Sequence, residues 1–264
     1  MSELGDSQPG GGTVRSDSPA ADRRAVDSPA AGPPAAGPPA VDPPTVWPAT
    51  GQRYPGYDVL AKRHSPSWNE QTRRVIDERL AVAPDTHHFF TDVEWPTVCA
   101  ICDRLIPQPR DKPGRVPIAA LLDAHLIHSP TEGYRDHRLP PMQEAWRHGL
   151  GALDTESQHS HEHRFHELDS SQQDALLHKV QHGDVRDSAW EKVPAKLFFK
   201  DRLLHDVMRI YYAHPTAWNE IGFGGPAAPR GYVRMDFDRR DPWEASEARP
   251  GREVRARREN ARIR

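Results

Sequence analysis

The sequence has few cysteines and no long apolar run, and both absences exclude whole classes of protein. Its 264 residues include 2 cysteines, which cannot build a disulfide scaffold. No run of about 18 apolar residues is present, so we expect no membrane span. Lysine and arginine number 35 against 38 acidic residues, a formal net charge of −3. That balance is not the electrostatic footprint of a sequence-independent nucleic-acid binder, so we expect no nucleic-acid partner.

Hydrophobic residues are also scarce. They make up 36% of the chain and the mean hydropathy is −0.80, whereas prolines number 27. Ten of these prolines lie within residues 9–48, among loose repeats of Ala, Gly, Ser and Asp. Such a segment cannot bury enough apolar surface to offset its chain entropy. We therefore predict a disordered proline-rich tail over residues 1–50, a helical domain over residues 51–245 and an arginine-rich flexible tail over residues 246–264.

The N-terminal tail also lacks the features of an export signal. Arg23-Arg24 resembles a twin-arginine pair, but Ala25-Val26-Asp27 follows it and no apolar stretch of about 7–15 residues is present. For the chain as written we expect a cytoplasmic location. A periplasmic location would require a partner that carries the chain, or a different start site.

Strand signals are nearly absent, and apolar residues recur at helical spacing instead. Three predicted helix starts have the spacing of a capping box: Ser67 to Glu70, Thr91 to Glu94, and Asp169 to Gln172. The last long helix is predicted to begin at Pro194 and to end at His214-Pro215. These patterns predict an all-α fold, an irregular bundle of about five or six helices with long ordered loops.

Two groups of residues have the composition of metal or redox sites. Cys99 and Cys102 form a C-x-x-C within a predicted helix, and we interpret them as small buried apolar residues rather than a redox pair or half of a zinc site. Of the 15 histidines, six are concentrated in one region: His159, His161, His163, His166, His178 and His182. His178 and His182 stand one helical turn apart, a spacing at which two imidazoles can share a metal. We interpret residues 159–166 as a solvated turn, with metal binding as the alternative.

Motifs for catalysis or cofactor binding are missing. The sequence contains no G-x-S-x-G and no P-loop. Gly222 to Ala227 reads G-x-G-x-x-A, but no strand precedes it and Pro226 blocks a following helix, so it does not fit a dinucleotide fingerprint. We expect these glycines to permit a sharp path or a close backbone approach. We predict no catalytic, cofactor-binding or metal-binding residues in this chain.

A set of aromatic residues with one arginine follows the last long helix, on chain predicted to be irregular. These residue types dominate the energetics of protein interfaces. The aromatics are Trp218, Phe223, Tyr232, Phe237 and Trp243. The predicted partner interface consists of Trp218, Phe223, Gly224, Gly225, Arg230, Tyr232 and Trp243. The alternative is that these aromatics fold back over the last helix. For the arginine-rich end, we favour a solvated tail over a surface for RNA or acidic lipid.

An ordered series of short motifs runs from about residue 52 to residue 245. In chain order they are Phe89-Phe90-Thr91 with Glu94-Trp95, Asp103-Arg104-Leu105-Ile106-Pro107, Trp146 with Gly149-Leu150 and Leu153-Asp154, Phe165 with Leu168 and Gln172-Gln173, Phe198-Phe199, Tyr211-Tyr212 with Pro215, and Gly222-Phe223-Gly224-Gly225-Pro226. In this order and spacing, the series resembles the gluconate 2-dehydrogenase subunit 3 family.

The resemblance implies a small helical accessory subunit that is not an enzyme on its own. In that family the chemistry resides in a large flavin-dependent subunit of the glucose-methanol-choline type, which acts on sugar acids or polyols. The resemblance therefore implies FAD in the partner subunit, none in this chain, and a cytochrome c subunit as a further partner. The alternative from the residues alone is a metal-binding helical enzyme that uses the histidines between His159 and His182.

Overall fold

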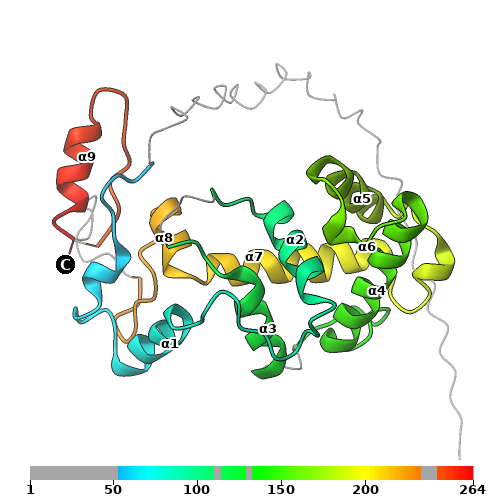
Figure 1. Ribbon diagram of the computed structural model, residues 1–264. Coiled ribbons are helices and arrows are strands. Elements are labelled where there is room, and N and C mark those ends of the chain that lie inside the picture. Colours follow the sequence, from blue (N-terminus) through cyan, green and yellow to red (C-terminus); the bar gives the residue numbers. More distant parts are fainter. Residues whose placement is uncertain (1–52, 110–113, 129–132, 233–242, 264) are drawn as a thin grey trace, which may run out of the picture. The chain divides into compact units, whose positions relative to one another are not determined.

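The computed structural model describes residues 53–109, 114–128, 133–232 and 243–263 (Figure 1). These residues contain helices and loops but no β-strand, and an isolated parallel bridge joins Trp68 to Ala228. The predicted all-α class is confirmed. The proline-rich segment 1–50 and Phe237 lie outside the described residues. Within the described residues, none of the helices is both long enough and apolar enough to cross a bilayer.

The described residues contain more and shorter helices than the five or six predicted. The α-helices are α1 (Glu70–Leu80), α2 (Trp95–Leu105), α3 (Ile118–His128), α4 (Met142–His161), α5 (Ser170–His182), α6 (Ala195–Phe198), α7 (His205–Tyr212), α8 (Pro215–Ile221) and α9 (Glu253–Asn260). Short 3₁₀ turns are η1 (Val59–Lys62), η2 (Phe165–Glu167) and η3 (Asp187–Ala189), and η4 (Phe199–Leu204) is π-helical.

A central helix is formed by α6, η4 and α7, which follow one another without a break. Its first half contacts α4 and α5, and its second half contacts α3, as the yellow helix in Figure 1 shows. The π-helical turn holds more residues than an α-turn and so changes which side chains share a face. Phe198, Phe199 and Leu203 are all buried as a result. The prediction of a last long helix that begins next to Pro194 is therefore confirmed.

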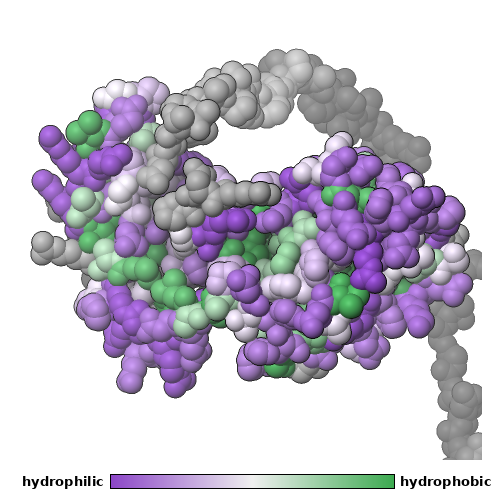
Figure 2. Space-filling view, viewed as in Figure 1, coloured by the Kyte–Doolittle hydropathy of each residue, from purple (hydrophilic) through white to green (hydrophobic). Residues whose placement is uncertain are grey.

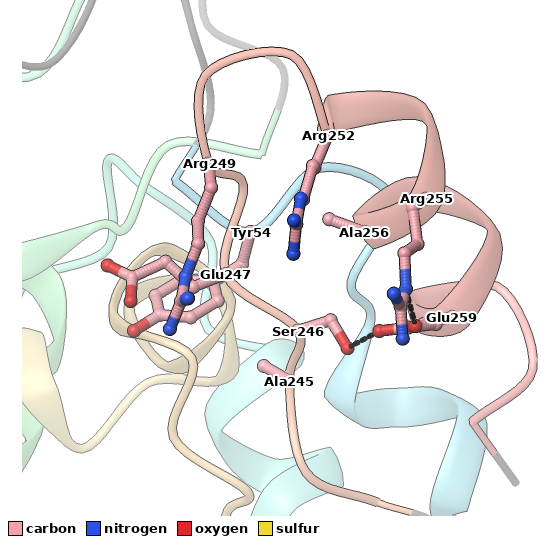
Figure 3. Close-up of a pocket in the computed structure, with 9 residues that line it drawn as sticks. All are labelled: Tyr54, Ala245, Ser246, Glu247, Arg249, Arg252, Arg255, Ala256 and Glu259. Carbon is pink, nitrogen blue, oxygen red and sulfur yellow. Dashed lines mark hydrogen bonds and ion pairs between the residues drawn. The ribbon is translucent and has the colours of Figure 1, made fainter.

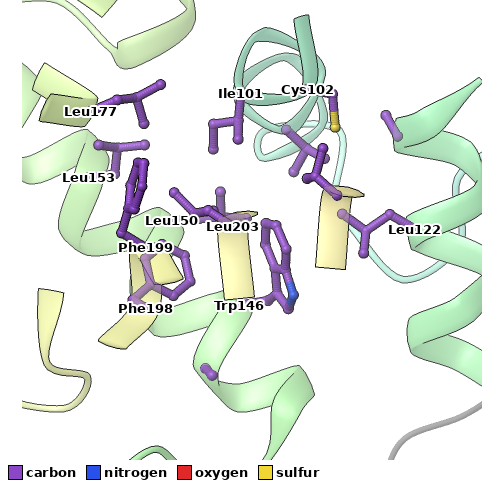
Figure 4. Close-up of a cluster of buried hydrophobic side chains, with 14 of the residues drawn as sticks. Ile101, Cys102, Leu122, Trp146, Leu150, Leu153, Leu177, Phe198, Phe199 and Leu203 are labelled. Carbon is purple, nitrogen blue, oxygen red and sulfur yellow. The ribbon is translucent and has the colours of Figure 1, made fainter. Parts of the chain in front are cut away.

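Trp146 lies in the main hydrophobic core, which the helices from α2 to α7 surround (Figure 4). Its ring packs edge-to-face against Phe90 and Phe198, with centroids 5.8 Å apart in both pairs. Its indole Nε1 donates to Asp206 Oδ2 at 2.8 Å, which gives the buried carboxylate a partner. Gly149 of α4 faces the same ring of Phe198, and a Cβ atom there would lie 2.1 Å from Phe198 Cζ. The packing of α4 on the central helix therefore requires a glycine.

Local signals placed the ends of α5 correctly and those of α1 nearly so. The Asp169 side chain accepts from Gln172 N at 2.9 Å, and Gly183 ends α5 with a φ of +74°. At α1 the cap is Asn69 rather than Ser67. The Asn69 side chain accepts a hydrogen bond from the backbone N–H of the third residue of the helix. Both are polar residues before an apolar stripe, so the sequence alone did not separate them.

His214-Pro215 begins a helix instead of ending the chain's last one. The His214 side chain accepts from Thr216 N at 3.2 Å, and Pro215 occupies the first turn of α8. Proline is favoured at this position because the first amides of a helix have no intrahelical partner. The helix α7 has already ended at Tyr212, so the dipeptide starts α8, and Trp218 lies on a helix rather than on irregular chain.

A second hydrophobic cluster joins both ends of the described chain. It consists of Tyr57, Val59, Trp68, Ile76, Trp218 and Ile263. The segment 246–264, for which we predicted a flexible tail, contains α9 and buries Ala256 and Ile263. Asn260 explains the difference, because its side chain bonds Ser246 N at 2.5 Å, Ser246 O at 3.0 Å and Pro55 O at 3.0 Å.

Candidate functional site

The glycines after α8 let the chain turn closely over aromatic side chains. Gly222 ends α8 with a φ of +68°, and a Cβ atom there would lie 2.5 Å from Tyr54 Cζ. Gly225 has a φ of +65°, and its Cβ would lie 3.0 Å from both Trp218 and Val59. A side chain at either position would be strained and would overlap its neighbours. The predicted close backbone approach is therefore made to this chain's own second cluster.

The predicted interface residue Trp218 does not face solvent. It is 3% exposed, and its indole Nε1 donates to Tyr212 O at 2.6 Å. Gly225 is likewise buried. The prediction of an exposed set of aromatics is therefore wrong for Trp218, because the N-terminal segment around Tyr57 and Val59 covers it. Trp218 instead supports the ring of Phe223, whose centroid lies 5.8 Å away in an edge-to-face pair.

Phe223 and Tyr232 reach the surface side by side. Their side chains are 39% and 65% exposed, and their rings stack with centroids 6.2 Å apart and an interplanar angle of 28°. The Tyr232 hydroxyl donates to Gly225 O at 3.0 Å, which fixes the ring over the glycine turn. These two aromatics form the exposed part of the predicted interface, and we call them the Phe223–Tyr232 pair.

Arg230 and Trp243 form the second part of the predicted interface. The guanidinium of Arg230 lies 3.6 Å from the centroid of the half-buried Trp243 ring, a cation–π contact. Gly224 lies against the same indole, because a Cβ there would be 3.3 Å from Trp243 Cδ1. The turn at 222–225 is thus in contact with both aromatic groups. On the face shown in Figure 2, hydrophobic side chains emerge only in small groups within a hydrophilic surface.

The backbone below these groups is held by buried polar side chains. The Tyr57 hydroxyl donates to Trp243 O at 3.1 Å and lies 3.4 Å from Phe223 O. Burial, with a smaller contribution from the Asp58 carboxylate, raises the pKa of Tyr57 to about 12. The indole Nε1 of Trp68 donates to Pro226 O at 2.9 Å. These contacts join the chain before α1 to the chain after α8.

Lys62 is the residue of this region that the sequence analysis missed. Its side chain is 1% exposed, and Nζ has no hydrogen-bond partner among the described residues. Its Nζ lies 5.9 Å from the centroid of the Trp68 ring. Burial, reinforced by the charge of Arg230, lowers the pKa of Lys62 to about 8. The local sequence Val59–Lys62 does not signal this burial, because Gly224 and Arg230, which lie near the amine, are distant in the chain.

Comparison with known proteins gives one positive result. A family model described as "Gluconate 2-dehydrogenase subunit 3" matches residues 92–225, about half of the chain. The chain belongs to this family. No curated protein matches it, and no solved structure does. The matched residues include α2 to α8 and the glycine turn, and they therefore contain most of the main core and Phe223.

Much of the second cluster lies outside the residues matched to the subunit 3 family. Tyr57, Val59, Trp68 and Ile76 precede residue 92, and Ile263 follows residue 225. These segments add to the family domain a layer that covers Trp218 and carries Tyr54 beneath Gly222. The glycine turn therefore packs against parts of this chain that lie outside the matched residues.

The two cysteines are free, with Cys102 buried and Cys99 half-buried in α2. Burial raises the pKa of the Cys99 thiol to about 11, and it raises the pKa of Cys102 well above its ordinary value. Both thiols therefore stay protonated near neutral pH, whereas a redox or metal-binding cysteine needs its thiolate. The interpretation of the C-x-x-C as part of the packed core is confirmed.

The structure brings only some of the histidines together. The rings of His178 and His182 lie 4.2 Å apart on exposed turns of α5, and His182 Nδ1 is 2.9 Å from His178 O. His159 and His161 belong to the last turn of α4 rather than to a turn between helices, and His166 Nδ1 lies 3.2 Å from Thr97 Oγ1. The described residues contain no group of three or more potential ligands with metal-binding geometry.

Proposed function

We propose that this chain is a non-catalytic small subunit that binds and stabilises a flavin-dependent dehydrogenase of the glucose-methanol-choline type. The substrate class is sugar acids or polyols, and the FAD belongs to the large subunit. Membership of the subunit 3 family carries this proposal, because that family is named as a component of gluconate 2-dehydrogenase. An accessory role agrees with the family name. A cytochrome c subunit is the proposed further partner, to which the complex passes electrons.

The Phe223–Tyr232 pair is the proposed contact with the large subunit, together with Arg230 and Trp243. Exposed aromatic rings on a rigid turn lose little conformational entropy on binding, and such residues are enriched among interface hot spots. The supporting turn is rigid because Gly222 packs against the half-buried Tyr54 ring, Gly225 packs against the buried Trp218 ring, and the Tyr57 hydroxyl donates to Trp243 O. Trp218 contributes by supporting Phe223 rather than by touching the partner.

The test is co-expression of the tagged chain with a flavin-dependent dehydrogenase of this type from the same genome, followed by size-exclusion chromatography. We expect a stable complex that carries flavin and oxidises gluconate or a polyol. The chain purified alone should be colourless and inactive. Turnover by the isolated chain, or failure of every such flavoprotein to co-elute, would contradict the proposal.

The contact itself is tested by the double variant Phe223→Ala/Tyr232→Ala. Because hot-spot aromatics typically cost more than about 1.4 kcal/mol each when truncated, we expect the dissociation constant to rise at least about tenfold. Tyr134→Ala is the matched control, since Tyr134 is 89% exposed and lies outside the proposed surface. Binding should be measured by surface plasmon resonance. Equal affinity of the double variant and the wild type would show that the partner binds elsewhere.

A further inference from the structure

An arginine-lined pocket lies outside the proposed contact and outside the family-matched residues. It has a volume of about 410 Å³ and lies between α9 and the loop that precedes it (Figure 3). The guanidinium groups of Arg249, Arg252 and Arg255 extend into it, above Ala245 and Ser246, and the Tyr54 ring lies at one side. Its volume falls within the range of about 300–1,000 Å³ that is usual for small-molecule sites.

The two carboxylates of the pocket are already engaged. Glu247 accepts from Arg53 Nε at 2.7 Å. Glu259 accepts from Arg255 Nε at 2.8 Å and from the Ser246 hydroxyl at 2.6 Å. In the part of the chain that the structure describes, neither carboxylate forms an ion pair with Arg249 or Arg252. Arg249 and Arg252 are exposed, and their guanidinium groups face the pocket with their charge uncompensated by an ion pair among the described residues.

The walls of the pocket are fixed by the contacts that hold α9. Asn260 joins α9 to Ser246 and to Pro55, so the helix and the preceding loop cannot separate without breaking buried hydrogen bonds. Ala256 is buried beneath the arginines and fills little space. The arginines therefore project from two segments of fixed spacing, which reduces the entropy lost when they close on a ligand.

We propose that this pocket binds a small anion that carries two or more carboxylate or phosphate groups. A guanidinium offers a planar fork of N–H donors that matches the oxygens of a carboxylate or a phosphate, and two uncompensated forks face this pocket. The site is independent of the proposed function, because every residue that lines it lies outside residues 92–225.

The test uses isothermal titration calorimetry of the full chain with pyrophosphate and with citrate, at constant ionic strength set by sodium chloride. We expect saturable binding at one site for at least one of the two probes. A stronger response to pyrophosphate would indicate a phosphate ligand, and a stronger response to citrate would indicate a polycarboxylate. Absence of saturable binding with both probes would overturn the proposal.

Two double variants separate a built site from a generally basic surface. Arg249→Gln/Arg252→Gln removes the two uncompensated guanidinium groups, and we expect at least a tenfold loss of affinity. Arg258→Gln/Arg262→Gln removes the same charge from exposed positions of the same segment outside the pocket, and we expect less than a twofold change. Melting curves check that both variants fold. An equal loss in both variants would also overturn the proposal.

Discussion

Single buried polar residues support much of this fold, and most of them have partners. Asp123 is 1% exposed and accepts three backbone N–H groups, from His88 at 2.7 Å, Phe89 at 2.9 Å and Phe90 at 2.8 Å. Lys62 is the contrasting case, because its buried amine has no hydrogen bond among the described residues. Burying such a group costs free energy in either protonation state, and more when it is charged.

Lys62→Met should therefore stabilise the protein at pH 7, by about 1–3 kcal/mol, because methionine has a similar length and needs no partner. The measurement is urea denaturation, and Lys179→Met on the exposed face of α5 is the control. We expect the control to change the free energy of unfolding by less than about 0.5 kcal/mol. A destabilised Lys62→Met variant would show that the amine is satisfied.

The same substitution should remove a dependence of stability on pH. The folded-state pKa of Lys62 is lowered to about 8 from an ordinary value of 10.5, so between these values only the unfolded chain holds the proton. Wild-type stability should then rise as the pH increases from about 8 to about 10. The advantage of Lys62→Met should shrink over the same range. A constant difference between the two proteins from pH 7 to pH 10 would contradict the lowered pKa.

At the level of elements, α4 contains two glycines with opposite roles. Gly149 faces Phe198 so closely that a Cβ atom would lie 2.1 Å from its ring, whereas nothing lies within 4 Å of a Cβ at Gly151. Both glycines are interior to the same helix. Intrinsic helix propensity therefore affects them alike, and packing alone separates them.

Gly149→Ala should destabilise the protein by about 1–3 kcal/mol, because the methyl group would clash with the buried Phe198 ring and force α4 and α6 apart. Gly151→Ala is the matched substitution, and it should stabilise the protein by about 0.5–1 kcal/mol through helix propensity. Thermal unfolding followed by circular dichroism measures both. Equal changes in melting temperature would show that α4 and the central helix are not packed as the structure has them.

At the level of the whole molecule, the segments before and after the family domain meet on α8. The second cluster takes residues from the segment before α1, from α1, from α8 and from the C-terminal end. Asn260 ties the last of these to Pro55, which is 205 residues away in the sequence. The second cluster supports the glycine turn at residues 222–225, and the exposed Phe223–Tyr232 pair lies against this turn.

Asn260→Ala should therefore lower the free energy of local unfolding of the C-terminal segment by about 2–3 kcal/mol. The reason is that Ser246 N and Pro55 O would lose their partners in a buried region. Limited trypsin digestion measures this, since α9 carries several arginines. We expect faster cleavage within residues 249–262 and unchanged protection of the main core. Val254→Ala, an exposed change on the same helix that leaves every arginine in place, is the control. Unchanged cleavage of Asn260→Ala would mean that the cluster alone holds α9.

The sequence alone was sufficient for the all-α class, for the family and for features set by neighbouring residues. The capping of α5 by Asp169 and Gln172 and its end at Gly183 involve residues within a few positions of one another, so the local sequence encodes them. His214-Pro215 is compatible with the end of one helix and with the start of the next. The local sequence did not distinguish the two, because proline is found both after helix ends and in the first turn of a helix.

Tertiary structure decided which of the predicted interface residues face solvent. Trp218 is buried because Tyr57, Val59 and Ile263 cover it, and Lys62 is buried by chain that is equally distant in sequence. The arginines of the C-terminal segment line a pocket because Asn260 holds α9 against Ser246 and Pro55. Burial depends on the sum of contacts from segments far apart in the chain, and no window of local sequence contains that sum.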